Sequence, residues 1–454
     1  HTAMADPEVT STNLTSANGN LPDIAGKATA AGIGSLPIVH AVDYGNELCI
    51  EGGWDAGTDL TGLIVICDRG VSGRVSKSQA VADAGGSGFV LINDELNGGS
   101  LLGDEYVVPG LFISYADGQA LKAWLDNGAT DHTAAISGTV IEIGDEYGDV
   151  LASFSSRGPN QAVDVIVPDV TAPGVDILAA LGDGAAESPV NYNDVVHGFI
   201  SGTSMSSPHV AGASALIRQV RPDWTPAEVQ SALMTTATPT VVTHEGNVAN
   251  PYEQGAGRAQ VDQAVDAGLL FDESIANYEA ANPDEGGDPR AINIPSFANS
   301  QCLAICEWTR TANVPVATGL PTGVTWTAST VSDDGLVVDV DLSPATVSPG
   351  DTMTLTVTAD VSGAVTGENH FSRITLTPSD ASIPAVTMPL AVVPSDSILP
   401  GAAELTTRRD AGSWLVEGLQ GLEITDFTGS VSGLGEADTT ERTLRPAPTR
   451  GARS

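Results

Sequence analysis

GTSMSSPHVAG, at residues 202–212, is the stretch that decides the fold, and it continues as ASALI to residue 217. Glycine and alanine stand where neighbouring backbones must approach, so the stretch predicts a buried helix. Ser204 lies at the start of that helix, among unpaired backbone N–H groups and at the positive end of the helix dipole. The oxyanion of an acyl-transfer reaction would be stabilised there. The alternative is that Thr203 or Ser204 only caps a core helix.

The motif at residues 202–212 resembles the nucleophile motif of subtilisin-like serine peptidases, the subtilases. The resemblance implies an α/β fold with a subtilisin-like parallel sheet, present here in part, and it implies Ser204 as the catalytic nucleophile of a serine endopeptidase. A serine hydroxyl is a weak nucleophile until a neighbouring base takes its proton. Subtilases order their triad along the chain as Asp, His and Ser, so both partners would precede Ser204.

The motifs that surround the subtilase aspartate and histidine, Asp-Thr/Ser-Gly and His-Gly-Thr-His, do not occur in the sequence. The histidines are His1, His40, His132, His197, His209, His244 and His370. His197 comes closest because Gly198 follows it, but Phe199 then departs from the motif. We expect His209 to be a packed helix residue, and the family's oxyanion asparagine is assigned to no residue.

We therefore expect the chain to be the carboxy-terminal portion of a larger secreted protease, with the triad Asp and His upstream, and to be inactive alone. It begins with histidine and shows no signal peptide. The alternative is a non-catalytic extracellular binding protein that retains a subtilase shell. An α/β-hydrolase esterase is excluded, because that fold requires Gly-x-Ser-x-Gly around its nucleophile.

Charge and cysteine usage narrow the possible partners and the compartment. The 57 acidic against 18 basic side chains give a formal net charge of −39, which repels nucleic acid and anionic membranes. The subtilase resemblance implies protein or peptide substrates. The cysteines fall in two local pairs, Cys49 with Cys67 and Cys302 with Cys306, without the spacing of a zinc site. We predict two disulfides, a secreted protein and no evident cofactor or metal, although structural calcium is not excluded.

Residues 23–145 form a unit with its own pattern of strands and helices. Strands are predicted at 62–67, 88–93 and 107–114, and helices at 76–84 and 118–125. The strings CDRGV at 67–71 and AGGSG at 84–88 resemble the protease-associated (PA) domain that many secreted subtilases insert before the serine motif. The resemblance implies that the PA domain is a lid, or that it contacts substrate or a partner subunit. Residues 1–22 would then be a residual catalytic segment.

The catalytic domain is expected to resume at residues 146–275. Thr225 predicts a helix N-cap, Pro226 suits the first helical position, and Glu228 completes a capping box. Asp169 and Asp223 lie in motifs that match the family, but we interpret both as turn and cap residues rather than triad members.

The carboxy-terminal region is predicted to be a linker, a sandwich and a tail. Residues 276–290 form the linker, which lacks the ligand spacing of a calcium loop. Residues 291–397 alternate apolar and polar side chains, as at 353–359, and predict a β-sandwich that resembles the fibronectin-III-like domain of PA-containing subtilases. Residues 398–454 are unassigned, and four arginines crowd their end: Arg442, Arg445, Arg450 and Arg453.

Overall fold

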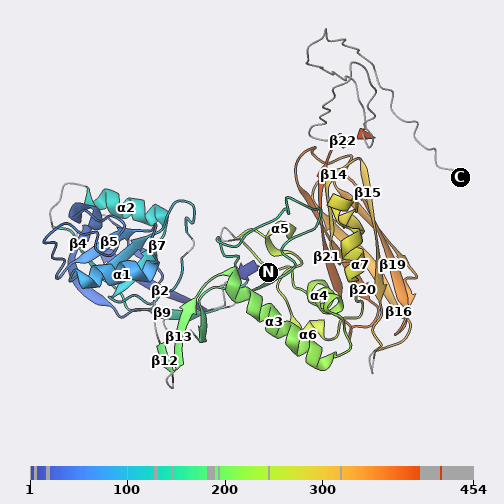
Figure 1. Ribbon diagram of the computed structural model, residues 1–454, viewed down its shortest axis with the longest axis horizontal. Coiled ribbons are helices and arrows are strands. Elements are labelled where there is room, and N and C mark those ends of the chain that lie inside the picture. Colours follow the sequence, from blue (N-terminus) through green and yellow to red (C-terminus); the bar gives the residue numbers. More distant parts are fainter. Residues whose placement is uncertain are drawn as a thin grey trace, which may run out of the picture. The chain divides into compact units, whose positions relative to one another are not determined.

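The computed structural model forms two compact units (Figure 1). Unit 1 comprises His1–Arg157, Pro168–Leu216 and Thr238–Ala259, and unit 2 comprises Gly158–Val167, Ile217–Ala237 and Gln260–Ser454. The structure describes residues 2–4, 8–16, 21–99, 101–126, 131–144, 148–180, 190–192, 195–243, 246–316, 320–398 and 420–421. Among these residues, no helix is long and apolar enough to cross a membrane.

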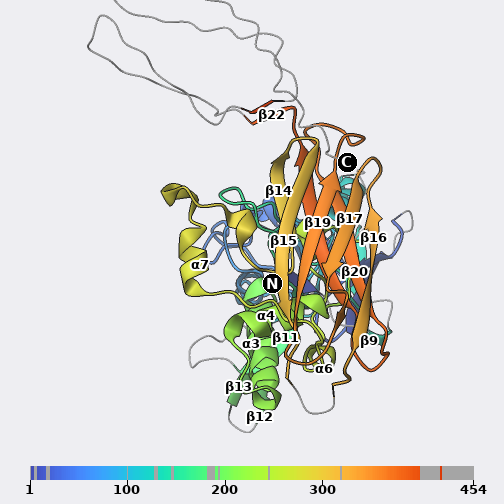
Figure 2. The ribbon, with the colours of Figure 1, turned by 90° about the vertical axis from the view of Figure 1, so that its right-hand side faces the viewer.

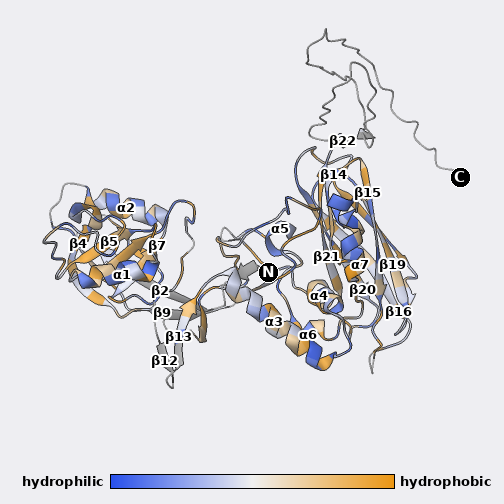
Figure 3. Cartoon of the chain, in the orientation of Figure 1, coloured by the Kyte–Doolittle hydropathy of each residue, from blue (hydrophilic) through white to orange (hydrophobic). Residues whose placement is uncertain are grey.

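Unit 1 contains an eight-stranded sheet of order β3-β2-β8-β4-β5-β6-β7, with β9 paired to β2. Its strands are β2 (Glu8–Ser16), β3 (Ile24–Gly26), β4 (Ile33–His40), β5 (Ile64–Asp68), β6 (Gly88–Ile92), β7 (Gly110–Ile113), β8 (Thr133–Ile136) and β9 (Val140–Ile143). β4 to β7 run parallel, and the other pairs are antiparallel. β5 and β6 are buried almost throughout, which explains their continuous apolar sequences (Figure 3).

Two helices cover this sheet, α1 (Arg74–Asp83) and α2 (Tyr115–Leu125). Both contact β6, and they lie on opposite sides of the strands in Figure 1. Gly118 lets α2 approach β6 closely, since a Cβ atom there would lie 2.1 Å from Cγ2 of Ile92. The predicted strands and helices of the PA insert are therefore present, and the helix expected at 118–125 begins earlier because Ser114 caps it at the Asp117 amide.

The amino-terminal boundary of this sheet differs from the prediction. Residues 1–22 were expected to belong to the catalytic segment, and β1 (Thr2–Met4) does pair in parallel with β10 (Thr171–Pro173). β2, however, hydrogen-bonds with β3, β8 and β9, so residues 8–16 are part of the insert sheet. Antiparallel pairing over this distance in sequence leaves no local signal.

The segment that carries Ser204 is built from short strands and one long helix. After β10 come β11 (Ile177–Ala180), β12 (Val190–Tyr192) and β13 (Val195–Ile200), which form an antiparallel sheet of order β11-β13-β12. α3 (Thr203–Val220) follows directly. The short helices α5 (Pro251–Gln254), α6 (Val261–Ala264) and α7 (Ile275–Ala280) lie further along the chain.

The predicted capping box at the start of α4 (Pro226–Thr235) is confirmed. The Thr225 hydroxyl accepts a hydrogen bond from the Glu228 amide at 3.1 Å, and the Glu228 carboxylate accepts one from the Thr225 amide at 2.8 Å. Asp223 lies exposed in the turn before this helix, in keeping with its interpretation as a turn residue.

Unit 2 is dominated by the β-sandwich. One sheet has the order β14-β21-β20-β16-β18, and the other has the order β15-β19-β17, whose strands lie side by side facing the viewer in Figure 2. The strands are β14 (Phe297–Cys302), β15 (Ile305–Asn313), β16 (Val324–Ser332), β17 (Val337–Ser343), β18 (Thr346–Val347), β19 (Thr352–Asp360), β20 (His370–Pro378) and β21 (Val386–Pro394). In β19 the predicted inward residues are fully buried: Met353, Leu355, Val357 and Ala359.

A buried arginine ties this sandwich to the segment before it. Arg310 is 2% exposed and donates hydrogen bonds to the carbonyl oxygens of Ile294, Arg290 and Ser296 at 2.8, 3.0 and 3.0 Å. Its guanidinium carbon lies 5.0 Å from the centroid of the Phe297 ring. Burial lowers the pKa of Arg310 to about 10, so the side chain is cationic at neutral pH.

The predicted linker contains short helical turns, namely α7, the 3₁₀ turn η3 (Pro283–Glu285) and the start of η4 (Pro289–Ala291). These residues group with the sandwich in unit 2. Of the predicted tail, β22 (Ser397–Ile398) pairs with β23 (Gln420–Gly421). Arg442, Arg445, Arg450 and Arg453 lie outside the described residues. The contact grouping places parts of 146–275 in both units, so the predicted boundaries at 145 and 275 stay predictions.

Both predicted disulfides are present. Cys49 pairs with Cys67 and Cys302 pairs with Cys306, each with a Cα–Cα distance of 5.7 Å. The first disulfide fastens the loop before β5 to that strand, and the second closes the turn that connects β14 of one sheet to β15 of the other.

Candidate active site around Ser204

Ser204 is the second residue of α3, and the start of that helix is fastened to β10. The Gly202 amide donates to the Gly174 carbonyl oxygen at 2.7 Å, and the Ser206 hydroxyl donates to the Ala172 carbonyl oxygen at 3.0 Å. Ser206 is fully buried, whereas Ser204 is exposed. The sequence of the first turn therefore uses one serine as an anchor and presents the other to solvent.

The backbone around Ser204 has the polarity of a helix start. The Met205 amide donates to the Gly202 carbonyl oxygen at 2.9 Å, whereas the amides of Thr203 and Ser204 precede the first helical hydrogen bond, and the helix dipole places partial positive charge there. Pro208, inside α3, has no N–H to donate to the Ser204 carbonyl oxygen, so that oxygen lacks its ordinary helical partner. The arrangement can stabilise negative charge that develops close to Ser204.

The predicted buried helix is exposed over most of its surface in this structure. In α3 the buried side chains are Ser206, Ala213 and Ile217. Leu216 and Val220 are each 56% exposed. Small residues permit close packing, but they do not supply the element that packs against them. In the described part of the chain, only the side of α3 that carries Ser206, Ala213 and Ile217 is packed against other residues.

No base is positioned beside Ser204 in the described part of unit 1, where Ser204 makes no side-chain hydrogen bond. His209 lies on α3, but it is exposed rather than packed, and its Nδ1 lies 2.9 Å from the Met205 carbonyl oxygen. His197 lies on β13 opposite Ala180 and Val190. His40 and His132 belong to the insert.

Of the remaining histidines, the structure describes one. His370 is on β20 of the sandwich, with Nε2 3.2 Å from the Val365 carbonyl oxygen. His1 and His244 lie outside the described residues. Asp169 lies in a turn where its carbonyl oxygen accepts the Ala256 amide at 2.9 Å, consistent with its interpretation as a turn residue.

Asp176 is a functional candidate that sequence reasoning missed. Its amide donates to the Ser201 hydroxyl oxygen at 2.7 Å, and that hydroxyl donates back to Oδ1 at 3.0 Å. The same carboxylate accepts the Gly103 amide at 3.1 and 3.2 Å. Asp176 has φ +53°, a left-handed conformation that Asp and Asn adopt more readily than most residues. It therefore positions the backbone that leads into Ser204.

Through Asp176 the serine segment contacts a loop of the insert. Leu102 packs with Ala152 and Val175 in a small apolar cluster beside the Gly103 hydrogen bonds. Asp104, the residue after Gly103, forms a bidentate ion pair with Arg74 of α1. The loop is thus held from the insert side by a charge pair and from the serine side by a carboxylate.

A cavity of about 460 Å³ lies in the same part of unit 1. Its lining includes Lys27, Leu101, Asp117, Leu151 and Val175, from both the insert and the serine segment. Ser204 is not among the lining residues, so this cavity is separate from the candidate active site.

Comparisons with known proteins give separate matches for the segment that carries Ser204 and for the insert. Residues 114–257 match the model of the subtilase family, and residues 34–121 match the model of the PA domain. The two matches overlap at 114–121, where the structure places α2 on the insert sheet. The PA match lies inside the predicted insert of residues 23–145.

Plant proteases are homologues of the chain. The subtilisin-like protease SBT1.3 of Arabidopsis thaliana is 40% identical over 242 residues, which cover 51% of this chain and 31% of that protein. SBT1.7 of the same plant is 31% identical over 382 residues, 75% of this chain and 49% of that protein. The chain thus spans about a third to a half of the curated relatives it matches.

Among solved structures, fervidolysin from Fervidobacterium pennivorans, a keratinolytic enzyme related to subtilisin, aligns with 74% of this chain and 44% of its own. The identity is 12% and the TM-score 0.21, which is too low for an argument about fold.

Proposed function

The chain carries a subtilase segment and a PA domain and is homologous to plant subtilisin-like proteases, and from this premise we propose that it serves as part of a secreted serine endopeptidase. Ser204 is the nucleophile, and the Asp and His of the triad are supplied from outside residues 1–454. The substrates are proteins or peptides. By itself the chain is inactive, because no histidine of the described residues is positioned to take the Ser204 proton.

The observation that carries this proposal is the difference in burial between two serines in the first turn of α3. Ser206 is buried and bonded to the Ala172 carbonyl oxygen, and Ser204, two residues earlier, is exposed and free to approach a substrate. A serine that only capped the helix would instead direct its oxygen at a backbone amide of the first turn. In the described residues Ser204 makes no such bond.

The reaction that fits this arrangement is acyl transfer. The Ser204 Oγ attacks the carbonyl carbon of a peptide bond as its proton passes to the base, and the amine leaves with a proton. An acyl ester on Ser204 remains, which water hydrolyses. The amides at the start of α3 stabilise the negative oxygen of the tetrahedral intermediates.

The test compares the chain alone with the longer natural protein. Loss of the base or the nucleophile lowers kcat by about 10⁶ in subtilisin, a member of the matched family. We expect residues 1–454 to hydrolyse peptides at no more than that residual level. In the longer protein, Ser204→Ala abolishes hydrolysis and labelling by a fluorophosphonate probe, whereas Ser207→Ala, at an exposed neighbour on α3, leaves both intact.

Two outcomes would contradict the proposal. Hydrolysis at ordinary protease rates by residues 1–454, lost in Ser204→Ala, would mean that a histidine of this chain is the base. A longer protein that binds peptides without cleaving them or reacting with the probe would favour the non-catalytic binding protein that retains a subtilase shell.

Secretion and the role of the PA domain belong to the same proposal. The two disulfides favour an oxidising compartment, because thiols in the cytosol are kept reduced. The PA domain would contact substrate or a partner subunit, and the loop at Leu102 and Gly103 would pass such contact to the serine segment. Residues 291–397 would serve as the fibronectin-III-like domain that their pattern resembles.

A further inference from the structure

A second cluster of reactive side chains lies in the insert, at the carboxyl ends of two parallel strands. His40 is the last residue of β4, and Asp68 is the last residue of the neighbouring β5. Glu47 comes from the loop after the short helix η1 (Ala41–Tyr44). The Cys49–Cys67 disulfide joins this loop to β5 one residue before Asp68, so the loop is held beside the strand ends.

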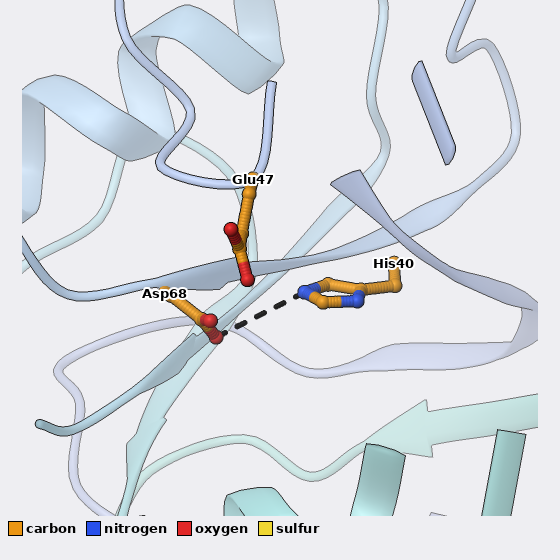
Figure 4. A group of neighbouring side chains, drawn as sticks. All are labelled: His40, Glu47 and Asp68. Atoms are coloured by element: carbon orange, nitrogen blue, oxygen red, sulfur yellow. Dashed lines mark ion pairs between the residues drawn. The ribbon is translucent and has the colours of Figure 1, made fainter. Parts of the chain in front are cut away.

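The three side chains converge on one point (Figure 4). One donor atom from each, the imidazole nitrogen and two carboxylate oxygens, lies within 4.8 Å of the others. Nε2 of His40 is 3.9 Å from Oδ1 of Asp68. In the described part of the chain, no other group of three or more such side chains converges in this way.

Two of these atoms are buried and have no partner. Nε2 of His40 and Oδ1 of Asp68 are inaccessible to solvent and make no hydrogen bond with a described residue. Leaving a buried polar atom unpaired costs about 1–3 kcal/mol. At 3.9 Å they are too far apart to bond each other, since such bonds span about 2.7–3.2 Å. The two atoms therefore face a gap that a small ligand would bridge.

A metal ion fits that gap. Zinc binds imidazole nitrogen and carboxylate oxygen at about 2.0–2.2 Å, so two of its ligand atoms lie at most about 4.2 Å apart. The observed 3.9 Å is inside this limit. Glu47, whose side chain is 51% exposed, can complete the set by a rotamer change.

Lys122 of α2 is the resident cation of the cluster. Its ammonium contacts Oδ2 of Asp68, the second oxygen of that carboxylate, and lies 3.9 Å from Oε1 of Glu47. The buried Lys77, which donates to the Leu48 carbonyl oxygen, is a further positive group that interacts with Asp68. A divalent ion would compete with the Lys122 ammonium for the two carboxylates, and Lys122 reaches solvent because its side chain is 21% exposed.

We propose that His40, Glu47 and Asp68 form a binding site for a divalent transition-metal ion, with Zn²⁺ as the expected occupant, and that binding displaces the Lys122 ammonium. One imidazole with two carboxylates suits zinc and its first-row neighbours, whereas Ca²⁺ and Mg²⁺ prefer oxygen ligands alone. Three protein ligands leave a fourth position for water or for a group from a partner.

The test is metal binding by metal-free residues 1–454, with the disulfides intact. We expect titration calorimetry with Zn²⁺ to give one site per chain, and Co²⁺ to give a visible absorption band of the same stoichiometry. His40→Gln and Glu47→Gln each weaken binding about tenfold or more. The exposed His209 supplies the matched control, and His209→Gln leaves binding unchanged. Circular dichroism shows that each variant is folded.

Lys122→Met distinguishes a built site from general attraction to an acidic protein. Removal of the competing ammonium strengthens Zn²⁺ binding severalfold at a designed site, and a hundredfold excess of Mg²⁺ does not displace the metal. The proposal is overturned if neither Zn²⁺ nor Co²⁺ binds at millimolar concentration. It is also overturned if folded His40→Gln and Glu47→Gln variants bind as the parent does, if Lys122→Met leaves the affinity unchanged, or if Mg²⁺ displaces Zn²⁺.

Discussion

The Asp176 carboxylate accepts a hydrogen bond from the Ser201 hydroxyl, three residues before Ser204, with 3.0 Å between Oδ1 and Oγ. The Asp176 amide returns a bond to the same hydroxyl oxygen, and the carboxylate also holds the Gly103 amide of the insert. The Asp176 side chain therefore holds both the backbone that leads to Ser204 and the insert loop at Gly103.

Asp176→Ala should loosen both attachments. The Gly103 amide and the Ser201 hydroxyl lose their acceptor, and each buried unpaired group costs about 1–3 kcal/mol. Asp176→Asn keeps one acceptor oxygen and tolerates the left-handed backbone, so its effect should be smaller. Hydrogen exchange of the Gly103 amide measures the change, with the exposed Asp223→Ala as control. Unaltered protection of Gly103 in Asp176→Ala would show that the contact does not hold the loop.

Arg310 should be essential for the sandwich, because its guanidinium donates hydrogen bonds to four carbonyl oxygens. Arg310→Ala removes these donors, although the Ile294 oxygen keeps the bond from the Ser296 amide. The free energy of unfolding of unit 2 should fall by about 1–3 kcal/mol for each buried oxygen left unpaired. Arg310→Lys should recover little, since an ammonium cannot reproduce the planar fork. Denaturant unfolding followed by tryptophan fluorescence measures the loss, and full recovery by lysine would contradict the account.

We expect Glu273 to contribute to the stability of unit 2 in a way that is lost at acidic pH. Partial burial raises the pKa of this carboxyl, but hydrogen bonds from the Asn293 and Ser274 amides and the Asn277 side chain outweigh it and lower the pKa below 4.5. A lowered folded-state pKa means stability that is present above 4.5 and is lost as the pH falls through the folded-state value. Glu273→Gln should flatten that part of the profile, measured by thermal unfolding between pH 3 and 6 (about the titration range of a carboxyl). A variant with the parent's slope would exclude Glu273 as a source.

The two disulfides should differ in strength according to the loops that they close. Cys49 and Cys67 are 18 residues apart, and Cys302 and Cys306 only four. Loop-closure entropy then predicts losses of about 3 kcal/mol and about 2 kcal/mol when each pair is replaced by alanine. The first replacement should lower the free energy of unfolding of unit 1, and the second should lower that of unit 2. A larger loss from the shorter loop would mean that native contacts, rather than the unfolded chain, set these values.

Local patterns were enough to predict much of the fold. The alternation at 353–359 identifies β19 because successive side chains of a strand must point to opposite faces. Thr225, Pro226 and Glu228 locate the start of α4 because a capping box involves only neighbouring residues. The motif around Ser204 likewise placed the candidate nucleophile at a helix start.

Features that depend on distant partners could not be predicted. Leu14 joins the insert sheet through Ile24 and Ile136, and no local pattern announces that pairing. The exposure of α3 depends on what packs against it and not on its small residues. Asp176 and the cluster of His40, Glu47 and Asp68 became visible only when the strands brought separate residues together.

The interleaving of the two units also bears on synthesis. The chain crosses between them after Arg157, Val167, Leu216, Ala237 and Ala259. A ribosome adds about 5–20 residues per second, and domains ordinarily fold as they emerge. Here unit 1 cannot be complete until Ala259 has left the ribosome, and the two early segments of unit 2 must wait for strands translated after them. During translation there is therefore a period in which both units lack segments needed to complete them. A chaperone would be most useful to the chain during that period.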